Sequence, residues 1–330
     1  MKSRVLRIGI SVAISSVFLA LAVRNVRWGE AIAALQEANY LYIAPLMAVG
    51  ILTLYTRAQR WRVFLKPIGV PPTRLLFHAT NIGFMANMLL PLRAGEVIRP
   101  VLVSRQVGLP LGGVLATILL ERIFDMFTVL LLFGLSVIVV PLSEQAMRWG
   151  LTLTGLAVVV GACIGLLRWQ ENLALGVIRR LCNLLLGRIG GPAYGFVAGF
   201  VKALEVLGSL SDFARAFAWS LYLWLIIAVL NALGLAAFHL PVQSALVVTA
   251  IVAIAVSVPS APGYIGSFQL GCVVSLAMYS VPESKALAFS IVHHLAQFVA
   301  TVGAGLYSLW SENLTLREVE SVERDDGTVA

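Results

Sequence analysis

Long apolar runs, separated by short charged segments, dominate this sequence. Of its 330 residues, 59% are hydrophobic and only 12% are charged, whereas soluble domains usually contain about 25% charged residues. A helix needs roughly 20 apolar residues to cross about 30 Å of hydrocarbon, and a transmembrane barrel would show short alternating segments instead. The pattern therefore predicts an all-α polytopic membrane protein, and we find no separate soluble domain in it.

About eight apolar segments are present, of which about six are long enough to be full transmembrane helices. The six are 5–23, 40–55, 109–142, 149–167, 216–238 and 286–310. The run 109–142 would measure about 50 Å as one helix, so it is either tilted or its first turns complete a hairpin with the segment before it.

Two further elements are too short to cross and are interrupted by Pro and Gly. One is 75–91, which spans about 25 Å, and the other is the pair 246–258 and 268–279, of about 18–20 Å each. We expect both to be re-entrant or broken helical hairpins of opposite orientation, as in an inverted repeat. Such paired breaks indicate a transporter site near the bilayer midplane.

The formal net charge of +8 is carried between the apolar runs, where basic residues set topology and meet anionic headgroups. It accompanies no nucleic-acid motif, so we expect no nucleic-acid partner. The basic cluster formed by Arg57, Arg60, Arg62 and Lys66 is predicted to be cytoplasmic. We expect a multi-pass protein of the bacterial inner membrane with both termini in the cytoplasm, and re-entry of 75–91 keeps the basic region 168–215 on that side too.

The expected organisation is one integral-membrane unit over 1–310 and a polar, disordered cytoplasmic tail over 311–330. Within the first, 168–215 is amphipathic and interrupted by Gly and Pro. It is either an interfacial cytoplasmic region or an ordinary connecting pair of helices.

Charged residues concentrate between positions 87 and 125, in a sequence that is otherwise hydrocarbon-like. They are Arg93, Glu96, Arg99, Arg105, Glu121, Arg122 and Asp125. Each costs roughly 2.5–3.5 kcal/mol at the centre of a spanning helix unless it is paired or faces water. Spacings of three and four place several of them on shared helical faces, so they either join helices or bind a ligand. Arginine suits phosphate, although Arg99 and Arg105 are equally explained by topology and surface-lipid contact.

The histidines give weaker signals. His293 and His294 are adjacent, so they point to different faces, and no Cys or carboxylate lies at metal-ligand spacing from them. His78 and Asn81, three residues apart, either line a cavity or bond to neighbouring backbone. We expect no metal, no cofactor and no catalytic residue.

Three motifs resemble the lysylphosphatidylglycerol synthase transmembrane family of flippase-like proteins. They are Asn87–Pro100 (NMLLPLRAGEVIRP), Glu121–Asp125 (ERIFD) and Pro259–Gln269 (PSAPGYIGSFQ). The family patterns are Asn-x-x-x-Pro-x-Arg-x-Gly-Glu-x-x-Arg, Glu-Arg-x-x-Asp and Pro-x-Pro-Gly-Gly-x-Gly-x-x-Glu. The positions that the resemblance makes candidate substrate-binding residues are Asn87, Arg93, Glu96, Arg99, Glu121, Arg122, Asp125, Pro259, Pro262, Gly263 and Gly266.

Two departures from the third motif matter for its chemistry. Tyr264 stands where the family usually has glycine, and Gln269 stands where it usually has glutamate. Losing that carboxylate weighs against a shared ion or proton site at this motif. Because the sequence ends at Ala330, we expect a stand-alone member without the family's separate synthase domain.

The resemblance implies translocation, by a flippase or scramblase, of an anionic, aminoacylated or glycosylated lipid with a phosphate-containing headgroup. The protein is then a transporter more readily than an enzyme. One alternative is a membrane-embedded transferase acting on a polyprenyl-phosphate or phospholipid, with Glu96 or Asp125 as general acid or base. Another is a non-catalytic partner of such an enzyme. The expected protein partners are a second copy of the chain or a separate lipid-modifying enzyme.

Overall fold

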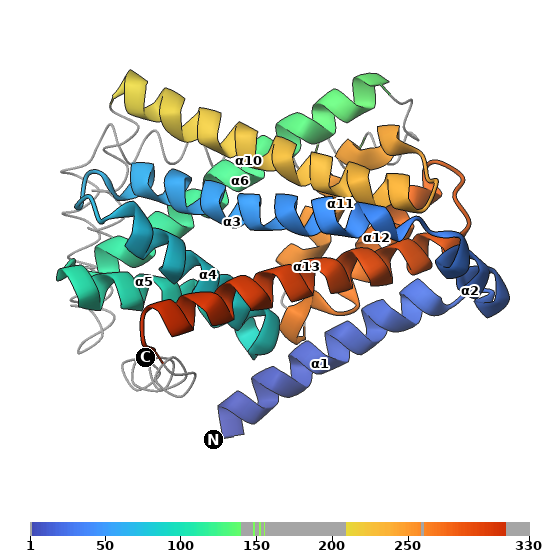
Figure 1. The fold of residues 1–330 in the computed structure, drawn as a ribbon, viewed down its shortest axis with the longest axis horizontal. Coiled ribbons are helices and arrows are strands. Elements are labelled where there is room, and N and C mark those ends of the chain that lie inside the picture. The colour runs from blue at the N-terminus through green and yellow to red at the C-terminus, as the bar shows by residue number, and fades with distance from the viewer. Residues whose placement is uncertain are drawn as a thin grey trace.

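The computed structural model describes residues 2–139, 209–258 and 261–314, with Arg148, Thr152 and Gly155 between them. All regular structure in these residues is helical, which confirms the all-α prediction. The body of the bundle (Figure 1) consists of five helices of 22 to 29 residues: α1 (Lys2–Val23), α3 (Ile43–Leu65), α6 (Leu111–Val139), α10 (Leu210–Ala237) and α13 (Glu283–Ser311). At 1.5 Å per residue, such helices reach about 33–44 Å, enough to cross a bilayer core.

Three of the described helices are both long and apolar enough to cross a membrane by themselves. They are Tyr40–Leu65, in which η1 (Tyr40–Tyr42) leads into α3, and the helices α10 and α13. A fourth candidate is the end of α1 together with α2 (Trp28–Glu37), which meet at a bend of 85°. The architecture is that of a multi-pass membrane protein.

The first predicted hairpin consists of α4 (Thr73–Leu89), the single turn η2 (Pro91–Arg93) and α5 (Gly95–Val107). Pro91 lacks the N–H that would continue α4, and Leu90 before it is extended. The two helices pack against each other and lie closest where Gly83 faces Gly95. A β-carbon on Gly95 would overlap the carbonyl oxygen of Gly83, so this crossing requires glycine.

The second hairpin follows the turn η5 (Val242–Ser244) and consists of α11 (Ala245–Ser257), η6 (Pro262–Tyr264) and α12 (Ser267–Ala277). Its tip has left-handed backbone at Gly263 (φ 68°) and Gly266 (φ 88°), a conformation that glycine adopts at no steric cost. The helices α11 and α12 pack closely together.

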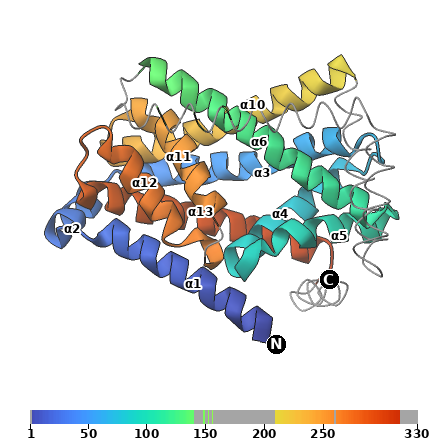
Figure 2. The ribbon, with the colours of Figure 1, turned by 180° about the vertical axis from the view of Figure 1, so that it is seen from behind.

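The two hairpins enter the bundle from opposite ends, and their tips meet inside it (Figures 1 and 2). The turn η2 of the first contacts η6 of the second, and η6 also packs on α4. Helix α3 runs beside them and packs against α4, α10 and α13. Opposed hairpins with touching tips are the arrangement expected from the paired breaks in the sequence.

The largest differences between the predicted and the observed boundaries are in α3 and α10. Helix α3 continues to Leu65, whereas the sequence suggests that the span ends at Tyr55, and α10 begins at Leu210 instead of Ala216. The predicted span 149–167 lies outside the continuously described segments, and most of the region 168–215 and of the tail 311–330 lies outside the described residues, as do Pro259 and Ser260.

Candidate functional site

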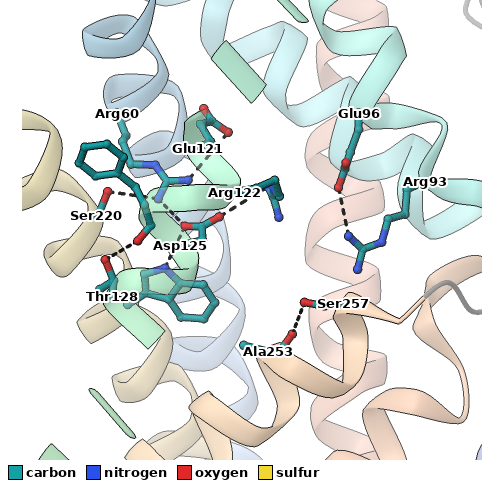
Figure 3. A network of polar contacts seen from close by, with 12 residues as sticks. Arg60, Arg93, Glu96, Glu121, Arg122, Asp125, Thr128, Ser220, Ala253 and Ser257 are labelled. Atoms are coloured by element: carbon teal, nitrogen blue, oxygen red, sulfur yellow. Dashed lines mark hydrogen bonds and ion pairs between the residues drawn. The ribbon is translucent and has the colours of Figure 1, made fainter. Parts of the chain in front are cut away.

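A buried ion-pair network joins four helices beside the hairpin tips (Figure 3). Arg60 of α3 is fully buried, and its Nη1 lies 2.5 Å from Oδ1 of Asp125 on α6. Its Nη2 lies 3.8 Å from Oε2 of Glu121, which also accepts a hydrogen bond of 2.7 Å from Nη2 of Arg99 on α5. From α10, Trp224 Nε1 donates to Asp125 Oδ1 at 2.9 Å. We refer to Arg60, Arg99, Glu121 and Asp125 as the buried ion-pair network.

The spacing along α6 explains why one helix serves several arginines. Glu121 and Asp125 are four residues apart and therefore lie on one face. Arg99 is fixed further because its guanidinium lies 4.3 Å from the ring centroid of Trp61. Such buried pairs are weak sources of stability, but removal of one partner leaves an uncompensated charge and costs about 3–5 kcal/mol. The network therefore fixes how α3, α5, α6 and α10 pack.

A second, partly exposed pair lies at the hairpin tips. Arg93 Nη1 is 3.3 Å from Glu96 Oε1, and their side chains are 24% and 30% exposed. The same guanidinium donates to the carbonyl of Val256 in the last turn of α11, where a cation is favoured by the unpaired carbonyls. It also lies 5.5 Å from the ring centroid of Tyr264. Arg93 thus connects the first hairpin to both sides of the second tip.

Arg122 lies between the network and the tip pair (Figure 3). Its Nη2 is 3.6 Å from Asp125 Oδ2, its side chain is 37% exposed, and its buried Nε has no hydrogen-bond partner. Arg57, one turn before Arg60 on α3, places its guanidinium 4.6 Å from the ring centroid of Phe84. No carboxylate among the described residues lies within 4.0 Å of Arg57. These two arginines are the least neutralised cations in the region.

A side-chain amide caps the N-terminus of the second helix in each hairpin. Oδ1 of Asn87 accepts a hydrogen bond of 2.9 Å from the N–H of Gly95, at the start of α5. Oε1 of Gln269 accepts one of 2.8 Å from the N–H of Gly266, at the start of α12. A buried N–H left without a partner would be costly at membrane depth, so each amide stabilises a break.

Gln269 carries out this capping with an amide oxygen, as a glutamate carboxylate would. Its Nε2 lies 3.1 Å from Nδ1 of His294, a contact in which the amide donates and a carboxylate could not. Glutamine in place of the family's glutamate thus keeps the cap and presents a hydrogen-bond donor to Nδ1 of His294. Tyr264, the other departure, adopts φ 60°, a region suited to the glycine that the family pattern has there.

The predicted site residues that the structure describes lie around the hairpin tips, but their roles there differ from one another. Arg93, Glu96 and Arg122 are partly exposed at the tips, with Pro262, Gly263 and Gly266 forming the facing turn. Arg99 is 4% exposed and paired with Glu121, and its contact with a phosphate stays a prediction. Pro259 lies outside the described residues.

Sequence reasoning missed Arg57 and Arg60, which it assigned to a basic cluster at the headgroups. The structure places both inside the bundle, since α3 continues past them. Their spacing of three residues, which places them on one face of α3, was the local signal. His78 and Asn81, left open between two roles, both contact Ser308 Oγ on α13, at 3.0 and 2.9 Å.

The described residues contain no group of three His, Cys, Asp or Glu side chains that could hold a metal ion. His293 and His294 stack on Phe268, with ring centroids 5.9 and 4.4 Å away. The chemistry available at the tips is thus that of arginine, one partly exposed carboxylate and backbone, which suits recognition of an anion.

Comparison with known proteins places the chain among membrane proteins. The family model described as the lysylphosphatidylglycerol synthase TM region matches residues 8–305. The chain is 25% identical over 336 residues to the glycosyltransferase AglD of Haloferax volcanii, covering 90% of this chain and 53% of AglD, about half of that relative's length. It is 25% identical over 288 residues to a UPF0104 membrane protein of Methanothermobacter thermautotrophicus, covering 83% and 84% of the two chains.

No solved structure matches the chain. The family match spans all three motifs and both hairpins. The chain belongs to the family of the lysylphosphatidylglycerol synthase transmembrane region.

Proposed function

We propose that this protein moves a lipid with a phosphate-containing headgroup across the membrane, as a flippase or scramblase for an anionic, aminoacylated or glycosylated lipid. The observation that carries the proposal is the meeting of two opposed, broken hairpins beside the partly exposed residues Arg93, Glu96 and Arg122. Membership in a family named for a lipid supports it.

The non-helical turns at the two hairpin tips constrain what surrounds them. Non-helical backbone at membrane depth is tolerated only where it is buried in protein or lines a wet path, and both tips are such backbone. Opposed hairpins are a means of alternating access, because one repeat can move against the other around a fixed site. Guanidinium groups at that site would bind a phosphate through two oxygens at once, while the acyl chains remain in the bilayer.

We propose the orientation from the charges at one end of the bundle. There Lys66 pairs with Asp212 at 2.6 Å and Arg74 lies 3.8 Å from Glu312, where α3 and α13 end and α4 and α10 begin. The exposed Arg62 and Arg105 lie at the same end. We propose that this end faces the cytoplasm, as the positive-inside rule predicts, and that the membrane is the inner membrane of a bacterium.

The test is transbilayer movement in liposomes that contain the purified protein and a headgroup-labelled fluorescent phosphatidylglycerol. A membrane-impermeant reductant quenches the outer leaflet, and the protected fraction reports lipid that has not moved. We expect wild type to accelerate movement, Glu96→Gln and Arg122→Gln to abolish the acceleration, and the exposed Arg62→Gln to leave it unchanged. Equal acceleration by wild type and both folded tip variants would overturn the assignment of these residues.

A membrane-embedded transferase is the second candidate, because one relative is named a glycosyltransferase. In this case Glu96, the one partly exposed carboxylate of the region, would be the general base. Incubating the protein with lipid acceptor and sugar donor would then give a headgroup-modified lipid by mass spectrometry, lost in Glu96→Gln. A protein partner, either a second copy or a lipid-modifying enzyme, would instead copurify in fixed proportion.

A further inference from the structure

The charges around the hairpin tips do not balance. Among the residues that the structure describes, five arginines, Arg57, Arg60, Arg93, Arg99 and Arg122, gather there with three carboxylates, Glu96, Glu121 and Asp125. Their formal charges leave two positive charges unmatched. An unmatched charge at membrane depth is costly, so a bound anion would stabilise the region.

The surplus can be assigned to particular side chains. Arg93 is paired with Glu96, and Arg99 is paired with Glu121. Arg60 takes the short contact to Asp125, which leaves Arg122 at 3.6 Å from that carboxylate with an unbonded Nε. Arg57 lies over the Phe84 ring, and no carboxylate of the described residues is within 4.0 Å of it. The unbalanced charge therefore lies on Arg57 and Arg122.

Tyr264 lies where these cations converge. Arg93, Arg122 and Arg57 all interact with it electrostatically, and Arg93 stacks against its ring. Tyrosine is retained there in a left-handed conformation (φ 60°), which for a residue with a β-carbon carries steric strain. Strain of this kind concentrates at functional sites, and the phenol hydroxyl of a tyrosine can donate a hydrogen bond to a bound anion.

We infer that Arg57, Arg122 and Tyr264 bind a doubly charged phosphate, as a phosphate monoester, and discriminate against a cationic aminoacylated headgroup. The inference rests on the proposed function and narrows it. Two negative charges on the ligand match the two unbalanced arginines, whereas a lysyl headgroup would add positive charge to a region that already has too much. Gln269 also favours an anionic over a cationic headgroup, because the family's glutamate would have supplied one more negative charge.

The experiment measures dissociation constants of the purified full chain in detergent for three probes: farnesyl phosphate, farnesol and lysylphosphatidylglycerol. We expect farnesyl phosphate to bind about tenfold or more tightly than either of the others. Arg57→Gln should weaken the binding of farnesyl phosphate by a similar factor, and Tyr264→Phe should weaken it by less. The matched control, Arg62→Gln on the exposed face of the same helix, should change it by less than about twofold.

Inorganic phosphate and pyrophosphate form the arm that separates a lipid ligand from a free anion. Much weaker binding of these ions than of farnesyl phosphate supports a lipid headgroup. Equal binding supports the anion site but overturns lipid translocation as the function. The inference is overturned if lysylphosphatidylglycerol binds more tightly than farnesyl phosphate, or if Arg57→Gln leaves the binding of farnesyl phosphate unchanged. The proposed function would still stand in either case if the protein moves lysylphosphatidylglycerol across the liposome bilayer.

Discussion

Two groups of charges lie side by side in this bundle and differ in almost every physical respect. In the buried ion-pair network, Arg60 and Glu121 are 0% and 1% exposed and each has charged partners on other helices. At the hairpin tips, Arg93, Glu96 and Arg122 are between 24% and 37% exposed. The difference indicates that intramembrane charge alone does not mark a binding site. A binding site is marked by charges that are incompletely neutralised and also accessible.

The largest expected effect comes from breaking the network. Asp125→Asn leaves Arg60 buried without its short ion pair, and Trp224 loses a charged acceptor. We expect about 3–5 kcal/mol of destabilisation, seen as a lower melting temperature or loss of monodisperse protein in detergent. The double variant Arg60→Met with Asp125→Leu should recover much of this, since it removes both charges. If Asp125→Asn is as stable as wild type, the network is not structural.

Gly95→Ala should have the next largest effect, because its β-carbon would overlap the backbone of Gly83 and separate the two helices of the first hairpin. Overpacking of this kind costs typically 1–3 kcal/mol. The matched control is Gly134→Ala, within α6, where a β-carbon meets nothing within 4 Å. That change should be neutral or stabilising, by up to about 1 kcal/mol. Similar melting temperatures for both variants would argue against a close crossing of α4 and α5.

Arg122→Gln tests the other side of the comparison. Its ion pair is long and more than a third exposed, so we expect a change in unfolding free energy within about 1 kcal/mol. Lipid movement should nevertheless be lost. Glu121→Gln, one residue away but fully buried, should show the opposite balance, with reduced stability. If both variants lose stability alike, the two groups of charges form one structural unit.

The sequence was sufficient for the hairpins and insufficient for the network, and the reason is the range of the interactions. Proline and glycine residues that interrupt short apolar segments are local signals, so the breaks at Pro91 and Gly263 could be predicted. The burial of Arg60 depends on Asp125, 65 residues further along the chain. Without knowledge of that pair, a run of basic residues is best assigned to headgroups, which is why the predicted span ended at Tyr55.

The roles of the site residues likewise depend on contacts that are distant in the sequence. Arg93 and Glu96 are three residues apart, and their pairing follows from helical geometry. Arg99 has no local sign that distinguishes it from Arg93, yet Trp61 and Glu121 bury it. Which arginine faces a ligand is decided by tertiary contacts, and Arg57 enters the candidate site only through them.

The smallest effect on stability is expected for Tyr264→Gly, which restores the residue of the family pattern. Two terms oppose each other: glycine relieves the left-handed strain, by about 1–2 kcal/mol, while loss of the ring removes the contact with Arg93, of about 0.5–1 kcal/mol. The melting temperature should therefore change little or rise slightly. Selectivity for phosphate monoesters should fall, because the hydroxyl and the ring are lost. A variant that is clearly destabilised would mean that the tyrosine holds the two tips together, and the contrast between a structural network and a functional tip would then not extend to this residue.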